Sequence, residues 1–162
     1  MAHPKPGFPE PEHNHGVCVA DALAAAAERC AARGARLTDI RREVLEVVWS
    51  SHRPIGAYDI LADLGRDGRR LAPPTVYRAL DFLLEHGLVH RVASRNAFFG
   101  CPSPGHATAV ELLICTECGS AVEVQEQRVS AAVAGAATRH DFEVLPQTIE
   151  ILGRCAACRA AA

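Results

Sequence analysis

Residues 73–87 read PPTVYRALDFLLEHG, and this stretch contains the start, the buried face and the end of one helix. Proline is favoured in the first turn of a helix, so the prolines at 73 and 74 mark the start. Glycine is favoured just after the last turn, so Gly87 marks the end. Apolar residues between them recur at helical spacing, namely Val76, Leu80, Leu83 and Leu84. The pattern predicts a helix over residues 74–86.

Three further helices are predicted upstream of this one. Residues 20–33 are rich in alanine, which favours helix, and Gly34 suits the position after their end. Thr38 can cap a second helix that reaches about Trp49. Residues 58–64 repeat the spacing of an apolar helical face, starting at Tyr58.

Downstream, residues 88–93 and 97–100 predict a β-hairpin. Several helices closed by a hairpin are typical of a winged helix-turn-helix. In that fold the helix over 74–86 is the recognition helix, which enters the major groove of DNA with its N-terminus first.

The pattern changes after Cys101, where Pro102, Pro104 and Gly105 predict a hinge. Strands are expected over 110–114, 121–124 and 148–152, with an alanine-rich helix over 127–140. The fold class is therefore α+β, with a winged-helix domain followed by a small α+β domain. The expected organisation is a flexible tail over 1–18, a winged helix over 19–100, a hinge over 101–107 and a second domain over 108–162.

The composition is that of a soluble globular protein, with 49% hydrophobic and 22% charged residues in 162. No run approaches the ~20 apolar residues that span a bilayer, and the N-terminus lacks a secretion signal, so we expect a cytoplasmic protein without a membrane partner. Residues 33–95 contain eleven arginines against eight acidic residues, whereas residues 96–162 contain four against seven. This asymmetry is compatible with a nucleic-acid module joined to a second domain.

Two Cys-x-x-Cys pairs stand out among the seven cysteines, Cys115 with Cys118 and Cys155 with Cys158. Each pair follows a predicted strand, so each offers two thiolates at a turn. Four thiolates suit tetrahedral Zn²⁺ at about 2.3 Å, in closed sites that stabilise small folds. A redox pair and unconnected thiols are the alternatives. A closed four-cysteine site has no open position, so it suits a scaffold better than a sensor.

Other possible metal ligands cluster around the boundary between the two halves, at His90, Cys101, His106 and Glu123. Spacing alone does not group them, since His90 also fits a solvated strand residue, Cys101 a small buried thiol and Glu123 an exposed charge. The tail offers His13, His15 and Cys18, for which a mobile segment without a fixed site is the simpler interpretation.

Four motifs together resemble the ferric uptake regulator family of metal-sensing repressors, and within it the zinc uptake regulators, over about residues 20–159. They are TVYRALDFL at 75–83, LVH at 88–90, CTECG at 115–119 and GRCAAC at 153–158. The resemblance implies an N-terminal winged helix and a C-terminal α+β dimerisation domain. It also implies a homodimer that binds double-stranded operator DNA when loaded with zinc and represses genes of zinc homeostasis, with no small-molecule substrate.

The resemblance implies two zinc ions per chain. Structural zinc would be held by Cys115, Cys118, Cys155 and Cys158, and regulatory zinc by His90, Cys101, His106 and Glu123. The segment between Cys101 and Cys115 differs in length from related regulators, so Glu111 is an alternative to His106. A thiolate with imidazoles suits zinc better than iron or manganese, and nickel remains open.

The resemblance also assigns Tyr77 and Arg78, at the start of the recognition helix, to base and backbone contacts with DNA. We expect Thr75 to join this surface, and Arg36 resembles a basic position of the family that reaches the minor groove. A buried aromatic is the alternative for Tyr77. Four other arginines fit phosphate contacts or solvated surface, namely Arg41, Arg42, Arg69 and Arg70.

Three other functions compete with a zinc-responsive regulator. No persuasive nucleophile–base pair or phosphate loop supports an enzyme. Cys18, Cys30 and Cys101 would allow a redox sensor of the same fold, and a regulator for another metal would share most of the motifs.

Overall fold

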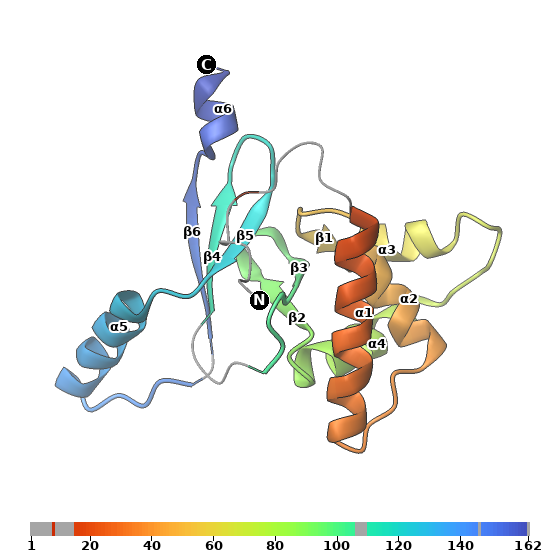
Figure 1. Ribbon diagram of the computed structural model, residues 1–162, viewed down its shortest axis with the longest axis horizontal. Helices are drawn as coiled ribbons and strands as arrows, with labels where there is room; N and C mark the ends of the chain where they lie inside the picture. Colours follow the sequence, from red (N-terminus) through yellow and green to blue (C-terminus); the bar gives the residue numbers. More distant parts are fainter. Residues whose placement is uncertain (1–7, 9–14, 106–109, 146, 162) are drawn as a thin grey trace. The chain divides into compact units, whose positions relative to one another are not determined.

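The computed structural model describes residue 8 and residues 15–105, 110–145 and 147–161. Its contacts divide the chain into two compact units, Pro9–Gly105 and His106–Ala162 with Met1–Phe8 (Figure 1). Within the described residues, every helix is too short or too polar to span a bilayer.

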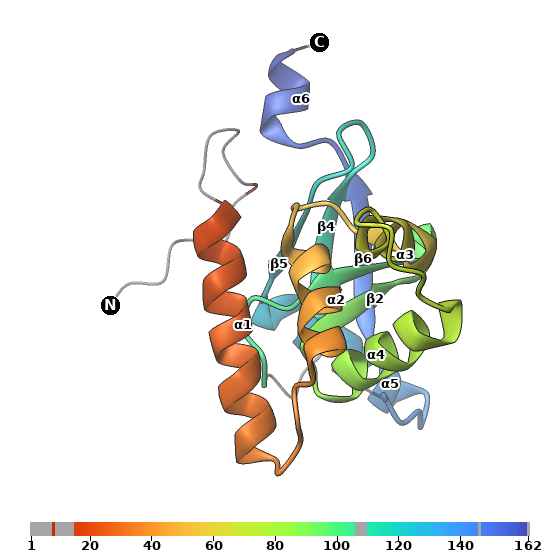
Figure 2. The same ribbon diagram turned by 90° about the vertical axis from the view of Figure 1, so that its right-hand side faces the viewer.

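The described part of the first unit forms four α-helices, which are labelled α1 to α4 in Figure 2. They are α1 (His15–Ala32), α2 (Asp39–Trp49), α3 (Ala57–Leu64) and α4 (Pro73–Glu85). Thr38 stands at the N-cap of α2 and a proline at the start of α4, as the sequence predicted. Helix α1 begins inside the expected tail, so His15 and Cys18 are helical. The sequence has no proline between Pro11 and His15, so no proline prevents the helix from beginning at His15.

A three-stranded antiparallel sheet completes the unit, with β1 (Ile55–Gly56), β2 (Val89–Val92) and β3 (Ala97–Gly100) in the order β1-β3-β2. The predicted hairpin is confirmed as β2 and β3. A 3₁₀ turn, η1 (Ala93–Arg95), joins the two strands, and Asn96 follows it with φ of 47°. Asparagine is one of the few residues that tolerate this left-handed conformation, so it suits the turn.

The core of the first unit lies between the helices and the sheet. Three residues of the predicted face of α4, Val76, Leu80 and Leu83, are no more than 1% exposed. They pack with Leu45 of α2 and Ile60 of α3. Burying each such side chain stabilises the fold by about 1.5–3 kcal/mol, which fixes α4 against the other helices.

Gly100, at the end of β3, packs directly against the only tryptophan, Trp49. A Cβ atom built on Gly100 would overlap the indole ring. We therefore expect Gly100→Ala to destabilise the first unit by about 1–3 kcal/mol through overpacking. Urea denaturation followed by Trp49 fluorescence measures this change. Gly153→Ala is the control, because no atom lies within 4 Å of a Cβ there, and an equal stability of the two variants would contradict the prediction.

Where the structure describes the second unit, it contains a three-stranded sheet and two helices. The strands are β4 (Val110–Cys115), β5 (Ala121–Val124) and β6 (Thr148–Gly153), and the helices are α5 (Gln127–Arg139) and α6 (Ala156–Ala160). The order β5-β4-β6 places β4 in the centre, antiparallel to β5 and parallel to β6. The strands and α5 match the sequence prediction. Helix α6 is too short to leave a periodic signal and was not predicted.

Candidate metal centres and nucleic-acid interface

The two Cys-x-x-Cys pairs meet at one end of the second sheet. Cys115 ends β4 and pairs with Gly153 at the end of β6, so both strands deliver their cysteines to the same place. The four Sγ atoms of Cys115, Cys118, Cys155 and Cys158 lie within 4.8 Å of one another. All seven cysteines are in the described part of the chain, and none forms a disulfide.

The geometry of this cluster fits a tetrahedral zinc ion. Four thiolates at about 2.3 Å from one ion would be about 3.8 Å apart. The Sγ atoms of Cys118 and Cys155 are 3.9 Å apart. The backbone N–H of Cys155 donates to Sγ of Cys115 at 3.4 Å, and that of Cys158 donates to Sγ of Cys155 at 3.5 Å. Such amide donors stabilise the thiolate form that a metal requires.

The thiols of the cluster differ in acidity. The backbone N–H groups of Cys155 and Cys118 lower the pKa of Cys115 to about 6, and the Ser120 side chain lowers the pKa of Cys118. The neighbouring Cys155 thiol and burial raise the pKa of Cys158 to about 12. Cys115 and Cys118 thus lose their protons more easily than ordinary thiols. Four thiolates this close together repel one another, however, unless a cation lies among them. A divalent ion that accepts four sulfur ligands meets this need.

Two side chains that could bind a metal lie close together in the first unit. His90 is on β2, and Cys101 follows β3, where its N–H donates to the Leu88 carbonyl at 3.0 Å. Both residues are buried, so His90 is not a solvated strand residue. An imidazole nitrogen of His90 and Sγ of Cys101 lie within 4.8 Å of each other. The wing therefore offers one nitrogen and one sulfur ligand in close proximity.

The other two predicted regulatory ligands belong to the second unit. Glu123 is a buried residue of β5 in the second unit, opposite Leu112 of β4. His106 lies outside the described residues, as does His13 of the tail. The complete set of four regulatory ligands therefore stays a prediction.

Glu111, the alternative to His106, has a different task in the structure. It pairs with Val124, the residue after Glu123, so the two glutamates point to opposite faces of the sheet. Its side chain is only 1% exposed. Oε1 accepts a hydrogen bond from Oγ of Ser130 at 3.0 Å, and Oε2 accepts one from the N–H of Glu126 at 3.3 Å. Glu111 therefore anchors the start of α5 to β4 and cannot share a metal with Glu123 from this position.

We expect Glu111→Ala to destabilise the second unit by about 1–3 kcal/mol, because it leaves the partly buried Ser130 hydroxyl and Glu126 N–H without their acceptor. The zinc content per chain should not change. Chemical denaturation gives the first quantity and elemental mass spectrometry the second. Glu143→Ala removes an exposed carboxylate and serves as the control. Loss of zinc from the Glu111 variant would instead restore Glu111 as a ligand.

The predicted DNA-binding residues lie on the surface of the first unit. Tyr77 is 39% exposed, which excludes the alternative of a core aromatic, and Arg78 beside it is also exposed. Thr75 is half-buried in the first turn of α4, and Arg36 is exposed in the loop before α2. The N-terminal part of α4 therefore presents polar and aromatic side chains to solvent.

Tyr58 of α3 was missed as a surface residue. The spacing placed it on a buried face, but it is 70% exposed. Its ring lies edge-to-face with that of Tyr77, with centroids 6.5 Å apart. The buried contacts of α3 come instead from Ala57 and Ile60. The phenol group, which prefers an accessible hydrogen-bond partner, was the signal that could have indicated the surface.

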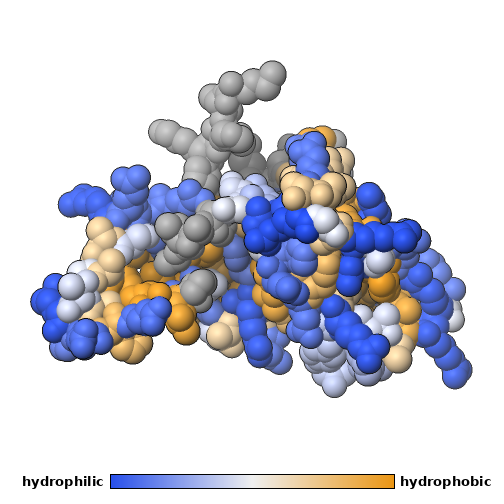
Figure 3. Space-filling view, turned by 90° about the horizontal axis from the view of Figure 1, so that it is seen from below, coloured by the Kyte–Doolittle hydropathy of each residue, from blue (hydrophilic) through white to orange (hydrophobic). Residues whose placement is uncertain are grey.

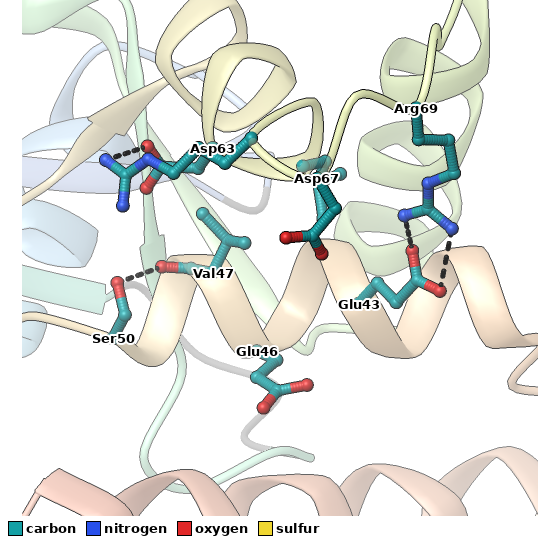
Figure 4. A pocket seen from close by; sticks show the side chains of 9 residues that line it. Glu43, Glu46, Val47, Ser50, Asp63, Asp67 and Arg69 are labelled. Carbon is teal, nitrogen blue, oxygen red and sulfur yellow. Dashed lines mark hydrogen bonds and ion pairs between the residues drawn. The ribbon is translucent and has the colours of Figure 1, made fainter.

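Another surface of the first unit is acidic (Figure 4). An open pocket of about 560 Å³ is lined by Glu43 and Glu46 of α2 and by Asp63 and Asp67. Arg69, predicted as a phosphate contact or solvated, binds Glu43 through its two terminal nitrogens, Nη1 and Nη2, and lowers the pKa of that carboxyl group. Arg66 also lines the pocket and pairs with Asp63, so four carboxylates stand against two arginines. The surface stays net negative, which disfavours contact with DNA phosphates.

Known proteins resemble this chain over most of its length. The sequence model of the Ferric uptake regulator family matches residues 32–152. The zinc uptake regulation protein of Escherichia coli (strain K12) is 43% identical over 140 residues, which cover 84% of this chain and 80% of that protein. The zinc uptake regulation protein of Mycobacterium tuberculosis (strain H37Rv) is 32% identical over 131 residues, 79% of this chain and 98% of that protein.

A solved structure of a zinc uptake regulator complexed with zinc and DNA also matches. The TM-score is 0.80 at 38% sequence identity, and the match covers 88% of this chain and 96% of the other.

Proposed function

The chain belongs to the ferric uptake regulator family, and from this premise we propose that it is a zinc-responsive transcriptional regulator that binds DNA. The relatives are zinc uptake regulators, and one of them is complexed with zinc and DNA. The chain is thus a transcription factor and not an enzyme. The observation that carries the zinc assignment is the four-cysteine cluster, whose 3.9 Å sulfur separation matches a tetrahedral zinc site.

Two zinc ions per chain have separate tasks in this proposal. Cys115, Cys118, Cys155 and Cys158 hold a structural ion, which ties the turn after β4 to the residues after β6. His90, Cys101, His106 and Glu123 hold a regulatory ion. The neutral His90 imidazole, the Cys101 thiolate and the Glu123 carboxylate are donors that zinc accepts, and the His90–Cys101 pair supports this assignment.

Regulation follows from where these ligands lie in the chain. His90 and Cys101 belong to the first unit, His106 lies in the predicted hinge, and Glu123 belongs to the second unit. An ion held by all four restricts how the two units move relative to each other. The restricted chain loses less entropy on binding DNA than one without the ion, so zinc and DNA binding favour each other.

The second unit supports a homodimer. Its edge strand β6 exposes Ile151 and Leu152, at 42% and 56%, and the segment between α5 and β6 exposes Phe142 and Leu145. Figure 3 shows apolar surface in the part of the molecule that carries α5. An exposed apolar edge strand favours pairing with a second copy. Two copies would present two α4 helices to major grooves about 34 Å apart.

The test measures metal content and DNA affinity together. A DNA fragment is first selected from a random pool by the zinc-loaded protein, and its binding is then followed by fluorescence anisotropy at buffered free zinc. We expect two zinc ions per chain by native mass spectrometry and loss of DNA binding when a chelator removes one of them. Release of DNA by peroxide at constant free zinc would favour a redox sensor, and a response to nickel alone would favour a regulator for another metal.

A further inference from the structure

Arg41 of α2 makes two contacts inside the first unit. Its guanidinium carbon lies 3.5 Å from the centroid of the Phe82 ring on α4. Its Nη1 donates a hydrogen bond of 2.6 Å to the carbonyl oxygen of Arg36, in the loop before α2. Arg41 is half-buried. The side chain therefore makes two contacts within the protein, which the expectation of a phosphate contact or solvated surface did not include.

The Phe82 ring is itself held in place at the end of α4. The His86 ring stacks on it at 3.9 Å between centroids and an interplanar angle of 25°. A ring nitrogen of His86, Nδ1, is 2.9 Å from the Phe82 carbonyl oxygen. Nε of Arg29 on α1 donates to the His86 carbonyl at 2.6 Å. The Phe82 ring on which Arg41 stacks is thus held in place by contacts with α1 as well as within α4.

We propose that Arg41 is a positioning residue for DNA recognition, which fixes the loop containing Arg36 relative to the recognition helix α4. Arg41 holds Arg36 only by its main-chain carbonyl, so the exposed Arg36 side chain stays available for DNA. The same α4 presents Tyr77 and Arg78. This inference rests on the proposed function, in which Arg36 and the start of α4 contact one duplex.

The contacts require the chemistry of arginine. A planar guanidinium group stacks on an aromatic face and donates in its own plane at the same time. Lysine would retain the positive charge but has no plane to stack and donates from a single nitrogen. A phosphate contact would tolerate this replacement much better, because the attraction depends mainly on charge.

A double-mutant cycle on the full-length, zinc-loaded protein tests the proposal. The variants are Arg36→Ala, Arg41→Ala and both together, measured by anisotropy on the selected DNA fragment. We expect each single change to weaken binding about tenfold, as for loss of one specific arginine contact. Because both changes remove the same Arg36 contact, the double variant should bind about as weakly as either single one. Independent effects would multiply to about a hundredfold and overturn the proposal.

The salt dependence of binding separates positioning from a direct phosphate contact. Each lost phosphate contact reduces the slope of log K against log salt by about 0.9. Adding Arg41→Ala to Arg36→Ala should leave the slope unchanged. A further reduction of about 0.9, or near-normal affinity of Arg41→Lys, would overturn the proposal.

Two controls keep the outcomes distinct. Arg42→Ala removes the exposed neighbour on α2, and its effect should simply multiply with that of Arg36→Ala. The Arg41 variants are folded if their urea denaturation curves, followed by Trp49 fluorescence, match that of the unaltered protein. If Arg41→Ala is unfolded, the affinity of Arg41→Lys for DNA tests the proposal in its place. If the unaltered protein bound no DNA, the proposed function would fail. If it bound DNA and the cycle showed no coupling, the positioning inference alone would fail.

Discussion

Cys118→Ser is expected to remove the structural zinc and unfold the C-terminal unit. Its Sγ lies 3.9 Å from that of Cys155, in a cluster formed by the ends of β4 and β6. Structural zinc contributes about 10–16 kcal/mol of apparent binding free energy at neutral pH, as much as the whole stability of a typical domain. Serine is a poor ligand for zinc in place of a thiolate, so the remaining three ligands should not hold the ion tightly.

The measurement combines zinc content by elemental mass spectrometry with amide hydrogen exchange. We expect one zinc ion fewer per chain and loss of protection for the paired amides of β4 and β6, whereas the helices of the first unit stay protected. Cys18→Ser is the matched control, because Cys18 lies on α1 and outside the cluster. A Cys118 variant with full zinc content would show that the four cysteines are not the structural site.

The sequence was sufficient to predict helix α4 and its buried face, because the signals are local. The prolines, the glycine and the apolar spacing all lie within residues 73–87. The four-cysteine cluster was also predictable, since each pair follows a strand and the two pairs share one ligand chemistry. Strand β1 contains only two residues and α6 only five, too few for a periodic pattern.

Contacts between distant residues explain what the sequence did not predict. Arg41 had the features of a surface arginine, and its role depends on Phe82 and on the Arg36 carbonyl. Glu111 had the features of a metal ligand, but the sheet register turns it away from Glu123 toward Ser130. In each case the side-chain type was compatible with both interpretations, and only the tertiary partner distinguishes them.

Cys101→Ser is expected to abolish zinc-dependent DNA binding while the protein stays folded. Cys101 provides the one thiolate of the predicted regulatory set, and its neighbour His90 cannot by itself hold zinc tightly. If the regulatory ion favours the DNA-binding state by about 3–4 kcal/mol, its loss lowers the affinity at saturating zinc several hundredfold. Serine is nearly isosteric with cysteine, so the strand pairing that ends with the Cys101 N–H bond to Leu88 should persist.

Anisotropy titrations at low and at saturating free zinc separate the two possible causes of weaker binding. A purely regulatory role requires that Cys101→Ser lowers affinity only at saturating zinc and binds like the unaltered protein at low zinc. The variant should also lose exactly one zinc ion and keep the one held by the four cysteines. The Cys18→Ser control should respond to zinc as the unaltered protein does. An unchanged zinc response in the Cys101 variant would remove this residue from the regulatory site, and the His90–Cys101 pair would then be a packing contact of the wing.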